Sequence, residues 1–285
     1  MAPPPVLRLV RWPGVATAAA DAAAGSALFY CTPGRTVAVV AAAALVYGGG
    51  VVLNDAADAA RDRILHPGRP IPTGAVARGA AIGFGAALLA AGVGAAAFAG
   101  TAPLAAYAGV AALALGYDFL FKRWGVAGAL ALGLCRGGSV LAAMTSSPGF
   151  PLEHPGRHLL VPLLFFLHGF AVTAASLLEE SPRGRGLVPA AAAGILLPTA
   201  LCFAFAGDPG SAGLRLALAA AALLTFSLGR SLAGDRTAGG IVREGVFGFL
   251  LLDAAVLGAH GLAWPAAGAL GLWALVRAAL RSGRS

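Results

Sequence analysis

The sequence predicts an all-α fold: a polytopic membrane protein that forms a bundle of nine to ten transmembrane helices. Composition and spacing carry this prediction. Hydrophobic residues make up 59% of the 285 residues and charged residues only 11%, and the mean hydropathy of +0.82 lies outside the range of ordinary soluble domains. The hydrophobic residues also come in runs close to the ~20 residues that a helix needs to cross a bilayer.

The apolar runs cover the whole chain, which we interpret as one integral-membrane domain, residues 1–285. Short breaks containing Pro, Gly and Arg separate ten candidate spans. These cover approximately residues 12–31, 36–58, 79–99, 102–120, 125–145, 159–178, 187–207, 212–232, 241–262 and 264–281. The first span resembles a signal peptide, because Arg8 and Arg11 precede an Ala-rich run. Asp21 in the middle of that run argues against this, so we expect the span to be retained.

The basic residues favour one orientation of these spans. With the N-terminus in the cytoplasm, most Arg and Lys residues fall on or near that side, and only Arg35, Arg157 and Arg215 fall opposite. This is the bias of the positive-inside rule, so we expect a multi-pass protein of the cell (plasma) membrane with both termini in the cytoplasm. The formal charge of +8 would be compatible with a nucleic-acid partner. Because the basic residues stand singly or in pairs between apolar runs, we expect the lipid bilayer and no nucleic acid.

The stretch from Asn54 to Gly74 gathers acidic residues in a chain that has few of them. At about 100° per residue on a helix, Asn54, Asp58 and Asp62 lie on one face and Asp55 lies roughly 100° round from Asn54. Carboxylates at this spacing repel one another and are costly near a bilayer unless cations compensate them. Oxygen ligands that leave positions open for phosphate and water suit Mg²⁺. These four residues predict a magnesium diphosphate site; the alternative is a solvated helix end beside a Pro/Gly turn.

The residues N-D-A-A-D-A-A-R-D, followed by R-P-I-P-T-G, resemble the first signature of the UbiA-type intramembrane prenyltransferases. The resemblance spans most of the chain and implies a helical bundle, usually of nine spans, with Mg²⁺ as cofactor. It implies transfer of a prenyl group from a polyprenyl diphosphate donor to an aromatic or other small-molecule acceptor, at a site facing the cytoplasm. Asp58 and Asp62 would be the catalytic acids. The tenth run, 264–281, would be an addition, a misread segment or a surface helix.

Basic residues near this motif are candidate partners of the donor diphosphate. Arg69 stands in the R-P-I-P-T-G part of the signature, and a guanidinium can bind phosphate oxygens through two hydrogen bonds. The segment Y-D-F-L-F-K-R-W resembles the Y-x-x-x-x-K-R segment of the family, which makes Lys122 and Arg123 candidates as well. The alternative for all three residues is an ordinary anchor at the membrane surface.

Arg136 lies well inside the fifth span, in G-L-C-R-G, and an arginine within a span is a functional hypothesis by default. We include it among the candidate diphosphate partners. The segment resembles the EboC-like branch of the superfamily. The alternative role is a structural ion pair with Asp118 or Asp21. Because Asp118 at the membrane edge is costly when unpaired, we expect it near a base such as Arg123 or Arg136.

The second signature of the family, D-x-x-x-D at the end of the sixth span, holds a second Mg²⁺, and here the chain departs from it. Glu179 and Glu180 stand adjacent, and no acid follows four residues later. Adjacent helical residues point about 100° apart, so the pair cannot reproduce two acids one turn apart. Both glutamates are candidate metal ligands; alternatively, the second metal and the usual activity are lost. The alternative function is a catalytically altered relative that binds or translocates a lipid-linked metabolite.

Overall fold

The computed structural model describes residues 4–150, 155–178, 184–205, 210–234 and 237–282, and every regular element in these ranges is a helix. The elements in chain order are α1 (Pro5–Leu9), α2 (Trp12–Leu28), α3 (Pro33–Ala57), α4 (Ala59–Leu65), α5 (Arg78–Ala97), α6 (Thr101–Gly116), η1 (Tyr117–Phe121), η2 (Lys122–Trp124), α7 (Val126–Met144), α8 (Pro155–Leu177), η3 (Gly184–Leu187), α9 (Val188–Leu201), η4 (Cys202–Phe205), α10 (Ala212–Ala233), α11 (Ala238–Ala259) and α12 (Ala263–Ser282). The predicted all-α fold is confirmed. Each of the ten predicted spans coincides with a helix to within several residues.

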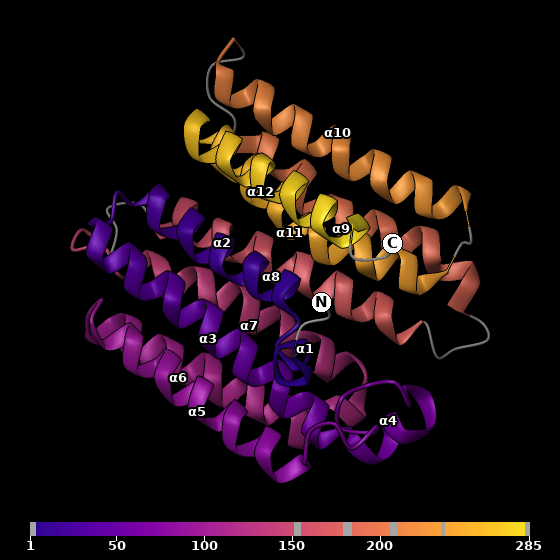
Figure 1. Cartoon of the computed structure of the whole chain (residues 1–285). Coiled ribbons are helices and arrows are strands. Elements are labelled where there is room, and N and C mark those ends of the chain that lie inside the picture. The colour runs from indigo at the N-terminus through magenta and orange to yellow at the C-terminus, as the bar shows by residue number, and fades with distance from the viewer. Residues whose placement is uncertain (1–3, 151–154, 179–183, 206–209, 235–236, 283–285) are drawn as a thin grey trace.

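The long helices lie side by side, and successive helices run in opposite directions (Figure 1). The short helix α4, the start of α1 and the end of α12 lie at the same end of the bundle, which we call the α4 end. The C-terminal ends of α3, α6, α8 and α10 also lie at this end. The acidic motif, the Lys-Arg segment and the start of the first long helix are therefore neighbours in space, although they are far apart in sequence.

Seven helices in the described ranges are long and apolar enough to cross a membrane: α3, α5, α6 extended to Trp124, α7, α8 from Leu159, α10, and α12 to Arg281. Three further long helices complete the bundle. α2 has 17 residues and α9 has 14, while α11 carries Arg243, Glu244 and Asp253 within its length. The predicted number of nine to ten spans is thus approximate, and the helical membrane bundle is confirmed.

The C-terminal helix α12, which corresponds to the tenth predicted span, is part of the bundle. It packs against α11 and also contacts α10 and α2, and Val276 is buried at 2% exposure. Arg277 donates a hydrogen bond to Glu244 of α11, and its guanidinium lies over the rings of Phe247 and Trp273. This ion pair and these ring contacts hold α12 against α11.

Glycines allow α3 and α5 to approach each other closely. A Cβ added to Gly49 would lie 2.8 Å from the carbonyl oxygen of Gly85 and 2.9 Å from the backbone nitrogen of Leu89. Backbone atoms cannot move aside as a flexible side chain can, so this contact requires glycine. Small residues serve this purpose in lipid, where helices associate by close packing. The contact fixes α3 against α5, and the C-terminal end of α3 carries the acidic motif.

Candidate active site

The acidic motif crosses the junction of α3 and α4 without losing its helical register. α3 ends at Ala57 and α4 begins at Ala59. The Asp58 nitrogen donates to the Asn54 oxygen at 2.9 Å, and the Asp62 nitrogen donates to the Asp58 oxygen at 2.8 Å. Because these bonds keep the four-residue spacing of a helix, Asn54, Asp58 and Asp62 stay on one face, as the sequence predicts.

Asp55 and Asp62 are both 3% exposed, and arginines compensate their charges. Asp55 Oδ1 accepts a hydrogen bond of 2.5 Å from Arg11 Nη2 and one of 3.5 Å from Arg69 Nη1. Asp62 Oδ2 accepts one of 2.6 Å from the same Arg69 nitrogen. Arg69 comes from the R-P-I-P-T-G loop, which ends at Gly74 with a φ of 78°, a conformation that favours glycine. The loop therefore turns its arginine back onto the two acids.

The Lys-Arg segment supplies partners for the other two motif residues. Asn54 Nδ2 donates to Asp118 Oδ1 at 2.6 Å, and Lys122 forms an ion pair with Asp58. Asp118 therefore accepts its hydrogen bond from Asn54, and the charge of Lys122 acts on it, while Arg136 pairs with Asp21. The segment that carries Asp118 is a π-helical turn, Tyr117–Phe121, which continues α6.

Arg123 takes a different position from its neighbour Lys122. It is exposed, its guanidinium lies 5.3 Å from the centre of the Trp124 ring, and it lines neither of the two cavities described below. Of the four predicted diphosphate partners, the structure brings Arg69 and Lys122 to the acidic motif.

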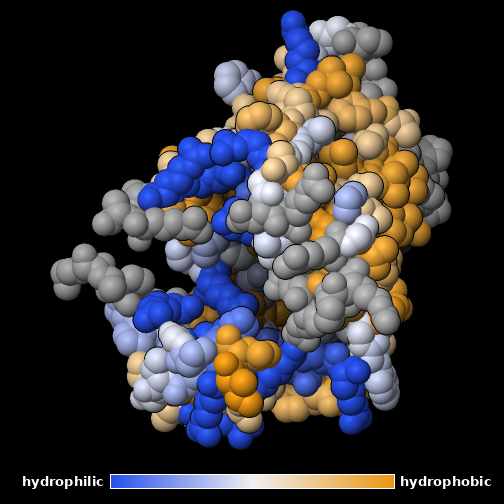
Figure 2. Space-filling view, turned by 90° about the vertical axis from the view of Figure 1, so that its right-hand side faces the viewer, coloured by the Kyte–Doolittle hydropathy of each residue, from blue (hydrophilic) through white to orange (hydrophobic). Residues whose placement is uncertain are grey.

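A polar cavity of about 240 Å³ opens beside the motif. Asn54, Asp58 and Asp62 line it, together with four basic side chains in the described part of the chain. The basic residues are Arg11, Arg61, Arg69 and Lys122. Viewed from the side of the molecule that is on the right in Figure 1, hydrophilic residues border a hollow (Figure 2). Since basic side chains outnumber acidic ones in its lining, the cavity suits an anion.

An apolar cavity of about 310 Å³ extends from the polar one between the long helices. Its walls come from α2, α3, α6, α7, α8 and α11. The two cavities share five lining residues and therefore adjoin. The shared residues are Arg11, Asn54, Tyr117, Thr173 and Ser176. The combined space has a charged part at the motif and a mainly apolar part deeper in the bundle.

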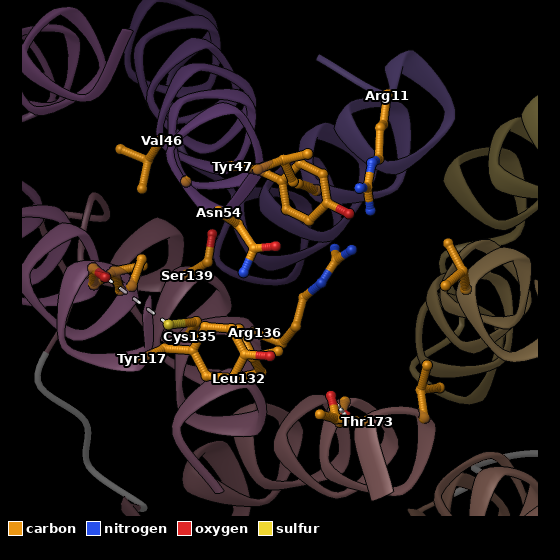
Figure 3. A pocket seen from close by; sticks show the side chains of 18 of the residues that line it. Arg11, Val46, Tyr47, Asn54, Tyr117, Leu132, Cys135, Arg136, Ser139 and Thr173 are labelled. Atoms are coloured by element: carbon orange, nitrogen blue, oxygen red, sulfur yellow. Dashed lines mark hydrogen bonds between the residues drawn. The ribbon is translucent and has the colours of Figure 1, made fainter. Parts of the chain in front are cut away.

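Arg136 belongs to the apolar cavity. It lines this cavity and does not line the polar one, and it points into the space between α7 and α3 (Figure 3). Its Nη1 donates to Asp21 Oδ2 at 2.6 Å, and its Nη2 donates to Thr17 Oγ1 at 2.8 Å. Of the two partners considered from the sequence, Asp21 is the one observed.

The donor chemistry of the motif fits Mg²⁺ bound together with a phosphate ligand. In the described ranges, no three His, Cys, Asp or Glu residues are placed to hold a metal ion by themselves. Mg²⁺ does not need such a cage, because it is held by one or two carboxylates and completes its shell with phosphate oxygens and water. Asp58, Asp62 and Asn54, whose side chains carry oxygen atoms of this kind, line the polar cavity. Glu179 and Glu180 lie outside the described residues.

Arg11 is the residue of this site that sequence reasoning missed. It was interpreted as a charge that orients the first span, whereas the structure places it against Asp55 and in the lining of both cavities. Its backbone is left-handed, with a φ of 50°, at the corner between α1 and α2. Pro13 marks the start of α2, but no local pattern in R-L-V-R-W-P-G indicates the left-handed backbone of Arg11 or its contact with Asp55.

A family model described as the UbiA prenyltransferase family matches residues 12–181, whereas no curated protein matches the chain in sequence. Three solved structures illustrate the shared fold. A UbiA homologue from Archaeoglobus fulgidus bound to GPP and Mg²⁺ is 16% identical, with 90% of this chain and 99% of that chain covered at a TM-score of 0.64. An apo UbiA homologue from Aeropyrum pernix K1 is 22% identical, with 85% and 96% covered and a TM-score of 0.62. A digeranylgeranylglyceryl phosphate synthase is 19% identical, with 91% and 98% covered and a TM-score of 0.61.

Proposed function

Because the chain belongs to the UbiA prenyltransferase family, we propose that it transfers a prenyl group from a polyprenyl diphosphate to an aromatic or other small acceptor within the membrane, with Mg²⁺ as cofactor. The homologue structures from Archaeoglobus fulgidus bound to GPP or DMAPP and Mg²⁺ support this class of donor and this metal. The positive-inside bias supports a plasma-membrane protein whose α4 end faces the cytoplasm.

The observation that carries the proposal is the junction of the two cavities. A prenyl diphosphate has a strongly anionic head and an apolar tail. The basic residues of the polar cavity complement the head, and the apolar cavity of about 310 Å³ offers space to the tail. Asn54 and Tyr117 line both cavities, so the bond between head and tail would lie beside the acidic motif.

The reaction breaks the allylic C–O bond of the donor, joins the freed carbon to the acceptor, and releases diphosphate and one proton from the acceptor. When bound, Mg²⁺ would neutralise charge on the leaving diphosphate, and Asp58, Asp62 and Asn54 would hold it. Lys122 and Arg69 orient the two acids through their ion pairs and add positive charge where negative charge develops. The apolar walls keep water away from the reacting carbon.

Donor binding is expected to depend on the metal. Geranylgeranyl diphosphate should bind the purified wild-type protein in detergent at least about tenfold more tightly with Mg²⁺ than with EDTA, because a cation between the carboxylates of the motif and the diphosphate adds its attraction to that of the basic residues. Isothermal titration calorimetry measures this ratio directly. Failure of geranylgeranyl diphosphate and its shorter homologues to bind in Mg²⁺ would contradict the proposed donor.

The alternative function, binding or translocation of a lipid-linked metabolite, makes a different prediction. A catalytically altered relative retains donor binding without turnover, or binds other lipids. Incubation of the wild-type protein with radiolabelled donor, Mg²⁺ and a panel of phenols and quinols separates the two functions, because only a transferase yields prenylated product and free diphosphate. Binding without product from any acceptor in the panel would favour the alternative.

A further inference from the structure

Arg136 is held rigidly in the wall of the apolar cavity. Its side chain is 11% exposed, Asp21 and Thr17 of α2 bind its two terminal nitrogens, and its guanidinium lies against two aromatic rings. The guanidinium carbon is 4.7 Å from the centre of the Tyr47 ring and 4.1 Å from that of Phe249. An arginine fixed on several sides keeps its remaining donors in a constant direction, which suits recognition of a ligand.

The guanidinium retains hydrogen-bonding capacity. It carries five N–H groups, and its bonds within the described residues use two of them. The labelled side chains in Figure 3 show Arg136 rising from α7 into the cavity, with Tyr47 of α3 and Arg11 on the far side. An oxygen atom of a ligand in the apolar cavity would therefore meet an N–H donor in a wall that is otherwise mainly apolar.

The charge around Arg136 restricts which oxygen is accepted. Asp21, fully buried, balances the guanidinium directly. Asp253 of α11 is 1% exposed and has no hydrogen-bond partner for either carboxylate oxygen in the described structure, and a carboxyl group buried in this way takes its neutral form. Arg136 and Asp21 then form a pair that is neutral overall. A carboxylate ligand would lose its hydration without gaining an unpaired cation, whereas a neutral oxygen would lose much less.

We propose that Arg136, framed by Asp21, Tyr47 and Phe249, is the binding site for a neutral hydroxyl or carbonyl oxygen of a small aromatic acceptor, and that this site discriminates against acceptors carrying a carboxylate. The inference rests on the proposed function, since the ligand is the acceptor of that reaction. It reassigns Arg136 from the diphosphate, which the sequence suggested, to the acceptor. The aromatic character follows from the rings of Tyr47, Tyr117 and Phe249 in the cavity wall.

A pair of matched probes tests the proposal. 2-Naphthamide and 2-naphthoate have nearly the same shape and differ in the charge of the head group. The wild-type protein in detergent should bind 2-naphthamide at least about tenfold more tightly than 2-naphthoate. Asp21→Asn removes the balancing charge, so the ratio of the two affinities should move at least about tenfold toward 2-naphthoate. The double variant Asp21→Asn/Arg136→Gln removes both charges and should lose affinity for both probes.

Arg277→Gln provides the matched control. Arg277 also pairs with a buried acid, Glu244, and also lies over two aromatic rings, but it lines neither cavity. Its substitution should leave the binding of both probes unchanged. The wild-type preference does not depend on any variant folding, so it tests the proposal even if Asp21→Asn proves unstable.

Three results would overturn the proposal: preference of the wild type for 2-naphthoate, binding of neither probe, or an unchanged ratio in folded Asp21→Asn. Binding of geranylgeranyl diphosphate with Mg²⁺, measured on the same preparations, separates this failure from a failure of the proposed function. If the donor binds and the probe pattern is absent, the acceptor assignment alone is wrong. If the donor does not bind, the proposed function itself is wrong.

Discussion

Asp58→Asn is expected to reduce magnesium-dependent prenyl transfer by a factor of about 10² to 10³, the effect of removing one group that stabilises developing charge, while the protein stays folded. Asp58 lines the polar cavity on the same helical face as Asn54 and Asp62 and pairs with Lys122. Asparagine keeps the size of the side chain and removes the charge that a metal ion requires. Because the Asp58 and Lys122 side chains are 19% and 21% exposed, solvent can compensate the lysine left behind.

The prediction is measured as product formation from radiolabelled donor and, independently of any acceptor, as Mg²⁺-dependent binding of geranylgeranyl diphosphate. Glu244→Gln is the matched control. It makes the same change from a carboxylate to an amide and also breaks an ion pair, with Arg277, but outside both cavities. Full donor binding by a folded Asp58→Asn protein would show that the Asp58 carboxylate does not hold the metal.

The sequence predicted what depends on local spacing. Helical periodicity placed Asn54, Asp58 and Asp62 on one face, and the structure keeps that face because the backbone hydrogen bonds continue across the α3–α4 junction. The ten apolar runs likewise predicted the ten long helices, because the length and composition of a run are enough to indicate a span. The motif also pointed to a group of basic residues, of which Arg69 and Lys122 lie against its acids.

Contacts between distant segments could not be predicted in the same way. The pairing of Asn54 with Asp118 depends on a π-helical turn, and such a turn has no signature in Y-D-F-L-F. Arg11 reaches Asp55 through a left-handed corner that the sequence does not mark. For Arg136 the sequence left two acids open as partners, because the choice between Asp21 and Asp118 is decided by how α2 and α6 pack around α7.

Gly49→Leu is expected to destabilise the protein by forcing α3 and α5 apart. The added side chain would begin at a Cβ only 2.8 Å and 2.9 Å from backbone atoms of α5, so the two helices must separate. Overpacking of this kind typically costs about 1–3 kcal/mol, occasionally more. At roughly 2–4 °C per kcal/mol for a chain of this size class, the apparent melting temperature in detergent should fall by about 2–12 °C, as measured by intrinsic tryptophan fluorescence.

Gly83→Leu separates this packing effect from the general cost of replacing a helical glycine. Gly83 is an exposed residue of α5, and a Cβ there meets nothing within 4 Å, so the melting temperature should stay within about 2 °C of the wild type, because substitutions at exposed positions are usually small in effect. Since α3 ends at the acidic motif, its displacement in Gly49→Leu should also weaken Mg²⁺-dependent donor binding, and in Gly83→Leu it should not. Equal melting temperatures for the two variants would mean that α3 and α5 are not in close contact. Contacts other than those between α3 and α5 would then have to fix the position of the acidic motif.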